Sequence, residues 1–110
     1  MKLVTSFLPP SRLEGVKRAL WDKGWRAFTV SQAQGLGVQR GRMDREDEFV
    51  TAFQPRFRLE LACRDEELEP LLEVLVEESR TGRVGDGKIL VTDLVEAIRV
   101  RTGERGDAAL

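Results

Sequence analysis

The segment that most constrains the fold is the alternating run "RFRLELAC" at residues 56–63. Apolar side chains occupy every second position, and the positions between them carry Arg56, Arg58, Glu60 and a small alanine. A period of two is typical of a β-strand with one buried and one open face. The run therefore predicts a sheet that other elements cover on one side only.

Further β-rich runs and two helical patterns surround this strand. The β-rich runs span residues 2–8, 26–35 and 88–91, and apolar spacing predicts helices at 13–24 and about 67–82. The order β-α-β, long loop, β-α-β is typical of an α+β ferredoxin-like βαββαβ sandwich, with an antiparallel sheet and both helices on one face. We expect one domain over residues 1–110 with a long loop at about 37–53.

Cap residues indicate where the helices begin and end. Ser11 followed by Glu14 predicts a capping box for the first helix. Asp65 is the expected N-cap of the second helix, and Gly82 is its expected C-terminal cap.

The C-terminal segment, about 97–110, is expected to contain one short strand at residues 98–101. In a strand, Arg99 and Arg101 would share one face, because alternate side chains point the same way. The alternative is a solvated edge that does no chemistry.

The composition excludes several kinds of site. The 110 residues include no His, no Tyr and one Cys, which excludes His-based catalysis, the usual zinc sites and a disulfide within the chain. A net charge of -1 argues against nucleic-acid binding driven by total charge. The remaining groups suit binding an anion better than breaking a bond. Without a long apolar run, we expect a cytoplasmic protein with no direct membrane insertion.

The stretch "TGRVGDGKILV" at residues 81–91 resembles a P-loop in spelling only. Ile89 stands where a P-loop needs Ser or Thr, and the turn leads from a helix into a strand, the reverse of a P-loop. One interpretation is a helix cap and a tight turn at Asp86-Gly87. The other is an anion cradle, in which Gly85 exposes backbone amides and Lys88 adds positive charge. Spacing alone leaves both open.

A second glycine-rich segment, "GLGVQRG" at residues 35–41, follows a predicted strand. Long excursions in a ferredoxin-like fold gather at the sheet edges. The two glycine-rich segments and the Arg99–Arg101 pair could therefore converge, across a subunit boundary if the chain oligomerises.

Taken together, "TGRVGDGKILV" and "VEAIRVRTGERGDAAL" resemble the C-terminal pattern of the PII signal-transduction proteins. The segments "GVKRAL", "GLGVQRG" and "QPRFRLEL" fall where that family has their counterparts, so the resemblance covers nearly the whole chain. Its C-terminal third is the most specific part.

The resemblance implies a homotrimer whose open sheet faces meet at the centre. It implies ATP or ADP in the clefts between subunits, with 2-oxoglutarate bound through a Mg²⁺ that the ATP phosphates hold. Such proteins are regulators and not enzymes, with at most slow incidental ATP hydrolysis. Their long loop docks on a target protein, such as an ammonium transporter or an enzyme of nitrogen metabolism.

The resemblance also assigns residues by position. Those that match the nucleotide site are Thr29, Gly35, Gly37, Glu60, Gly85, Asp86, Gly87, Lys88, Arg99 and Arg101. Those that match the 2-oxoglutarate site are Gln39, Arg40, Gly41 and Arg56, and Gln39 also matches the side chain that helps to hold Mg²⁺. Arg56 replaces the lysine that the family usually has there.

Three departures from the family pattern bear on function. Val38 replaces an arginine that usually reaches the terminal phosphate, so ATP is expected to be favoured less over ADP. The loop from Gly37 to Phe53 is expected to be two residues shorter than usual. Phe49 lies near the place of the tyrosine that some members uridylylate, and Asp47 near that of a phosphorylated serine, so we expect neither modification.

The sequence leaves three other functions open. The first is a PII-like nucleotide sensor that responds to a different effector outside nitrogen control. The second is an ATP-hydrolysing enzyme, for which the sequence supplies no evident base. The third is an RNA-binding module, which would need exposed aromatic side chains on the sheet instead of Arg56, Arg58 and Glu60.

Overall fold

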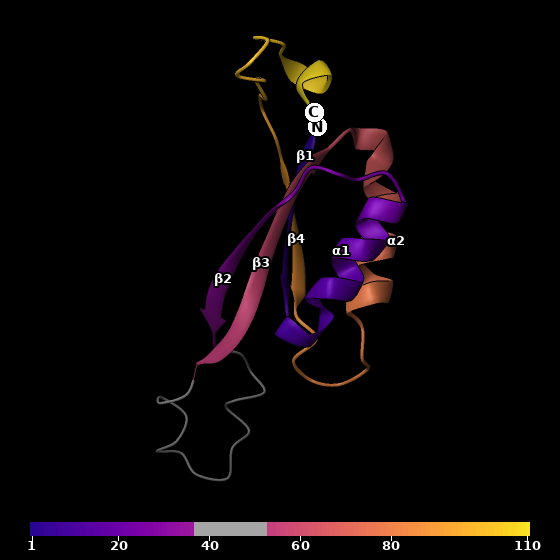
Figure 1. The fold of residues 1–110 in the computed structure, drawn as a ribbon, viewed down its shortest axis with the longest axis vertical. Helices are drawn as coiled ribbons and strands as arrows, with labels where there is room; N and C mark the ends of the chain where they lie inside the picture. Colours follow the sequence, from indigo (N-terminus) through magenta and orange to yellow (C-terminus); the bar gives the residue numbers. More distant parts are fainter. Residues whose placement is uncertain (37–52) are drawn as a thin grey trace.

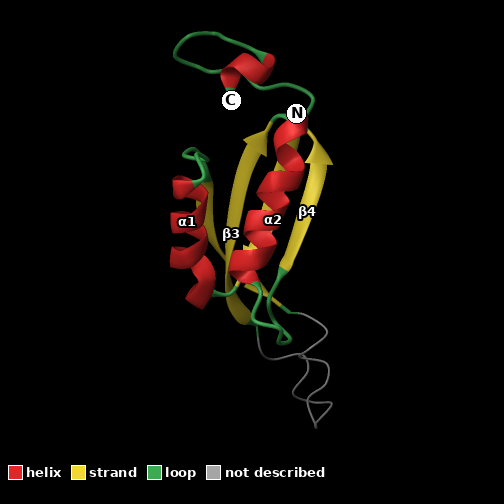
Figure 2. Ribbon diagram, turned by 90° about the vertical axis from the view of Figure 1, so that its right-hand side faces the viewer, coloured by secondary structure: helices red, strands yellow, loops and turns green. Residues whose placement is uncertain are grey.

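The computed structural model describes residues 1–36 and 53–110, which form one antiparallel sheet covered by two helices (Figure 1). The elements are β1 (Lys2–Leu8), α1 (Leu13–Asp22), β2 (Thr29–Gly35), β3 (Gln54–Cys63), α2 (Leu68–Ser79) and β4 (Lys88–Asp93). The strand order is β2-β3-β1-β4, and each neighbouring pair is antiparallel. Both helices lie on the same face (Figure 2). The ferredoxin-like prediction is confirmed.

The core lies between the sheet and the helices, on the side that the alternation of β3 predicts. Leu59, Leu61 and Cys63 are at most 4% exposed, while the residues between them are half-buried. The other buried apolar residues come from β1 and the inner faces of the two helices: Val4, Leu8, Val16, Leu20, Leu71 and Leu75.

Among the described residues, no helix lies on the opposite face of the sheet, since α1 and α2 are both on the other side (Figure 1). Glu60 on this face accepts a hydrogen bond from the Thr5 hydroxyl at 3.1 Å and pairs with Arg58 at 3.0 Å. Phe7 is half-buried and Leu90 is 47% exposed on the same face. The open face is therefore mixed, with an ion pair near its middle and apolar side chains around it.

The capping box predicted at Ser11 is wrong. Residues Pro10–Arg12 form a 3₁₀ turn that leads into α1, so Ser11 is already inside helical backbone. Arg12 precedes α1 without a side-chain cap, and the Glu14 carboxylate accepts a hydrogen bond from Lys17 at 3.0 Å.

The predicted caps of α2 are also wrong. Asp65 lies in a 3₁₀ turn, Asp65–Glu67, where the Glu67 carboxylate accepts a hydrogen bond from the Arg64 amide at 3.1 Å. The helix ends at Ser79 with an extended Arg80, so Gly82 lies in the following loop. Pro70 falls in the first turn of α2, where no intrahelical amide bond is lost.

The strand predicted at residues 98–101 does not form. Only Ile98 pairs, in an isolated bridge with Arg105, because the chain turns back between them. The Gly103 amide closes this turn by donating to the Arg99 carbonyl at 2.7 Å. Arg99 and Arg101 therefore lie at a turn and not on a strand face, and the segment projects beyond the end of the sheet (Figure 1).

Across residues 1–36 and 53–110, no helix combines the length and the apolar character needed to cross a membrane.

Candidate functional site

A cavity of about 550 Å³ lies at one end of the open sheet face, where β2 ends and β4 begins. Its walls come from both strand ends, from β1 and β3, and from the glycine-rich loop between α2 and β4. The lining residues are Phe7, Ala33, Gln34, Gly35, Leu36, Arg56, Arg83, Gly85, Asp86, Gly87 and Lys88. The antiparallel register explains this convergence, because Phe7 pairs with Lys88 in one ladder and Ala33 with Arg56 in another.

Gly87 brings the glycine-rich loop into contact with β1. It has a φ of 101°, a conformation that L side chains rarely adopt. A Cβ atom at this position would lie 1.8 Å from the Phe7 carbonyl oxygen. Glycine is therefore required here for both conformation and space, and the loop closes one wall of the cavity only because the side chain is absent.

Asp86 lines the cavity and also organises the glycine-rich loop. Its carboxylate accepts hydrogen bonds from the Thr81 amide at 2.7 Å, from the Gly82 amide at 2.9 Å, and from the Thr81 hydroxyl. These bonds, above all that from the Thr81 hydroxyl, hold the pKa of Asp86 below its ordinary value. These hydrogen bonds compensate the negative charge of the carboxylate within the loop. They also fix the backbone between Gly82 and Gly87.

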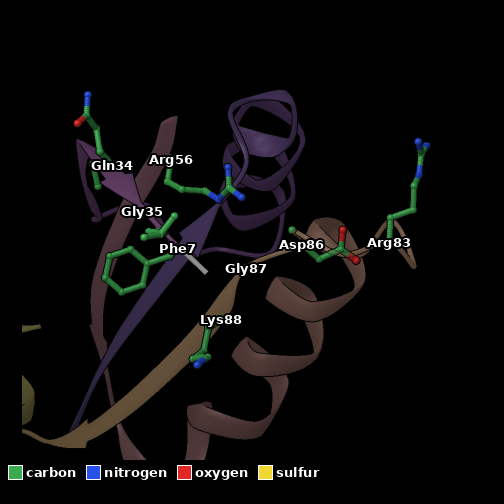
Figure 3. A pocket seen from close by; sticks show the side chains of 11 residues that line it. Phe7, Gln34, Gly35, Arg56, Arg83, Asp86, Gly87 and Lys88 are labelled. Carbon is green, nitrogen blue, oxygen red and sulfur yellow. The ribbon is translucent and has the colours of Figure 1, made fainter. Parts of the chain in front are cut away.

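Three cations of the described residues line the cavity: Arg56, Arg83 and Lys88. Arg56 lies between the two glycine-rich segments, since its Cγ is 3.8 Å from a Cβ placed at Gly35 and its Nη2 is 3.5 Å from one placed at Gly85. Its Nη1 donates to the Pro55 carbonyl at 2.8 Å. Figure 3 shows Arg56, Phe7, Gly87 and Lys88 grouped together, while Arg83 extends away from them. Arg56 and Lys88 thus place positive charge beside bare glycine backbone.

Of the predicted site residues that the structure describes, six lie together and four lie elsewhere. The six that line the cavity are Gly35, Arg56, Gly85, Asp86, Gly87 and Lys88. Thr29 and Glu60 face each other across β2 and β3 and line a different hollow with Leu3 and Ala62. Arg99 and Arg101 lie past the opposite end of the sheet, in the projecting C-terminal segment (Figure 1).

Four predicted residues, Gly37, Gln39, Arg40 and Gly41, lie outside the described residues, as do Val38 and the expected shortening of the loop. Gln39, the residue predicted to help hold Mg²⁺, is therefore outside the described residues. In residues 1–36 and 53–110, no group of three or more Cys, Asp or Glu side chains is placed to hold a metal ion.

Sequence reasoning missed Thr81 and five of the lining residues, namely Phe7, Ala33, Gln34, Leu36 and Arg83. Phe7 and Arg83 line the cavity, and Thr81 holds the Asp86 carboxylate. The spacing of Thr81 and Asp86 across a glycine-rich loop was the signal available for the last pair. Phe7 carried no such signal, because its position depends on the pairing of β1 with β4.

Substituting Asp86 by Asn is expected to destabilise the fold at pH 7 and much less at pH 3. The folded pKa of Asp86 is lowered relative to the ordinary value of about 3.9. Its stabilising effect is therefore fully present above that value and is lost as the pH falls through the folded pKa. Thermal unfolding of wild type and Asp86→Asn from pH 3 to 7 measures this difference. Asp22→Asn, at an exposed position on α1, is the control, and a pH-independent gap for Asp86→Asn would contradict the prediction.

The fold and cavity define a small ferredoxin-like protein with a cationic, glycine-walled pocket. The family model for "Nitrogen regulatory protein P-II" matches residues 1–104. The chain is 41% identical over 112 residues to the nitrogen regulatory protein P-II of Rhodospirillum rubrum, and all of both chains is covered. It is 38% identical over 112 residues to the nitrogen regulatory protein GlnK of Escherichia coli K12, again with all of both chains covered.

A solved structure agrees with these sequence comparisons. The crystal structure of Arabidopsis thaliana PII bound to citrate matches with a TM-score of 0.83 and 33% identity, over 99% of this chain and 91% of that one. The chain therefore belongs to the nitrogen regulatory protein P-II family. The resemblance found in the sequence is confirmed, and the protein is a member of a family of regulators.

Proposed function

We propose that this protein senses adenine nucleotides as a homotrimer and regulates a transporter or an enzyme of nitrogen assimilation by direct contact. The observation that carries the proposal is the cavity in which Gly35, Gly85, Gly87, Arg56 and Lys88 meet. Bare glycine backbone and fixed cations are the groups that bind phosphate chains in proteins.

The separation of the predicted residues supports a site between subunits. Thr29 and Gly35 lie at opposite ends of β2, about 20 Å apart at roughly 3.3 Å per residue. Arg99 and Arg101 lie still further from the cavity, past the end of β4. A nucleotide that contacts all of these residues must therefore lie between two copies of the chain. The open sheet face offers a surface on which copies can meet.

The same cavity is proposed to take 2-oxoglutarate next to the nucleotide. Arg56 lies beside both Gly35 and Gly85, so its guanidinium can bind a carboxylate while Lys88 binds phosphate. Mg²⁺ would be held mainly by oxygens of ATP, with Gln39. The protein acts on its target through contact and not through catalysis, in keeping with the regulatory names of its relatives.

Titration calorimetry with ATP and Mg²⁺, with and without 2-oxoglutarate, tests the proposal. We expect 2-oxoglutarate to tighten ATP binding, because the two ligands would share Mg²⁺ and neighbouring cations. Native mass spectrometry should first show a trimer, at three times the 12.4 kDa of one chain.

The outcomes separate the candidate functions. Tight ATP binding that 2-oxoglutarate does not change would favour the alternative, a nucleotide sensor with another effector outside nitrogen control. Val38, at a position where the family usually has arginine, is the observation that favours that alternative. Absence of ATP and ADP binding by a confirmed trimer would contradict both.

A further inference from the structure

The turn in the C-terminal segment is built around one carboxylate, that of Glu104. This carboxylate forms an ion pair with the Arg99 guanidinium at 2.9 Å and accepts a hydrogen bond from the Thr102 hydroxyl at 2.8 Å. The backbone of Glu104 also forms hydrogen bonds in this turn. Its carbonyl accepts one from the Arg99 amide at 2.9 Å, and its amide donates one to the Thr102 hydroxyl at 3.2 Å. Glu104 therefore fixes both the backbone and the side chain of Arg99.

Arg101, two residues further on, lacks such support. Within the described part of the chain it forms no ion pair, and its side chain is exposed. Of the two arginines proposed for the nucleotide site, only Arg99 has a guanidinium that the protein holds in one place.

We propose that Glu104 is a positioning residue, whose carboxylate holds the Arg99 guanidinium ready for the phosphates of a nucleotide bound by a neighbouring copy. The inference rests on the proposed function, because it assumes that Arg99 contacts the nucleotide. Glu104 binds Nη1 of the fork and the Leu110 carbonyl accepts a hydrogen bond from Nη2 at 3.1 Å, so that three of the five N–H groups remain for the nucleotide. Pre-ordering matters for arginine because a long, flexible side chain loses much rotamer freedom on binding.

The pair acts on binding more than on stability. Both side chains are partly exposed, at 38% for Arg99 and 45% for Glu104, and exposed ion pairs stabilise folds only slightly. Removing the Glu104 carboxylate should therefore leave the melting temperature nearly unchanged. The expected effect is a loss of ATP affinity of about 2- to 12-fold, the usual effect of ordering one long side chain on binding.

Calorimetry on three variants at equal protein concentration tests this assignment. Glu104→Ala should weaken ATP binding, whereas Glu104→Gln should bind ATP at least as well as wild type, because its amide oxygen can still accept from Arg99. Glu96→Ala is the matched control. Glu96 binds Arg105 in the same segment, at 2.8 and 3.1 Å, but Arg105 has no place in the proposed site.

Each contrary result overturns the inference in its own way. Equal losses for Glu104→Ala and Glu96→Ala would mean that the segment merely needs its ion pairs to fold. Tighter ATP binding by Glu104→Ala would mean that Glu104 repels the nucleotide. Unchanged binding would mean that Arg99 needs no support.

A second readout requires no nucleotide and so separates this inference from the proposed function. In ¹⁵N NMR of the nucleotide-free protein, rotation of the Arg99 guanidinium should be slow in wild type and Glu104→Gln, and faster in Glu104→Ala, where the bond from Arg99 to the Leu110 carbonyl remains without the carboxylate. Slow rotation together with no ATP binding by wild type would refute the proposed function, and the role in nucleotide binding with it. Fast rotation in wild type would refute the positioning itself.

Discussion

Replacing Gly87 by alanine is expected to lower the free energy of unfolding by about 3–5 kcal/mol. Two costs add at this position. The backbone has a φ of 101°, which strains any residue with a Cβ atom, and that atom would lie 1.8 Å from the Phe7 carbonyl oxygen. The contact is with backbone, so relief requires the loop to move away from β1 and to open the cavity wall.

Urea unfolding at a fixed protein concentration measures this cost, because assembly makes apparent stability depend on concentration. Gly82→Ala is the matched control. Gly82 also has a positive φ, 81°, but nothing lies within 4 Å of a Cβ placed there. Gly82→Ala should lower the free energy of unfolding by only about 1–2 kcal/mol, the strain of one left-handed residue. Equal costs at the two positions would show that the Phe7 contact is unimportant.

Replacing Lys88 by methionine is expected to weaken ATP binding by about 10- to 150-fold. The substitution keeps most of the aliphatic chain and removes the ammonium group. A hydrogen bond from a charged group contributes about 1.5–3 kcal/mol, which corresponds to that range. Lys88 lines the cavity beside Gly87. It is the first residue of β4, and its pairing with Phe7 on β1 fixes its backbone.

Lys17→Met provides the control for the change in net charge. Lys17 lies on α1 and pairs with Glu14 at 3.0 Å, away from the cavity. It should leave ATP affinity within about twofold of wild type, since exposed charges are screened beyond about 10 Å at 0.1 M salt. A similar loss for both variants would mean that ATP responds to overall charge, and that the cavity is not the nucleotide site.

The local patterns of the chain predicted the architecture well. Alternation in residues 56–63 indicated a sheet with one covered face, and Leu59 and Leu61 are buried on that face. The strand expected at residues 2–8 is β1, and Pro70 lies in the first turn of α2. These features depend on neighbours within a few residues, so periodicity and backbone restrictions suffice to find them.

Helix caps and the tail were predicted less well. Ser11, Asp65 and Gly82 are residue types that favour caps, yet 3₁₀ turns and an extended Arg80 moved the helix ends away from them. At residues 98–101 the β-forming residues had no strand beside them except the returning Arg105. Propensity is a weak local term, and the available partners decide between nearly equal conformations.

By itself, the sequence determined the order of elements, the buried face of the sheet and the resemblance to the PII family. Only the tertiary structure decided how the glycine-rich stretch 81–91 is used. It placed Gly87 against Phe7, turned the Asp86 carboxylate back onto Thr81, and set Arg56 between Gly35 and Gly85. The contacts of Gly87 and Arg56 join residues far apart in the chain, and they exist because strand register and core burial bring the ends of the strands together.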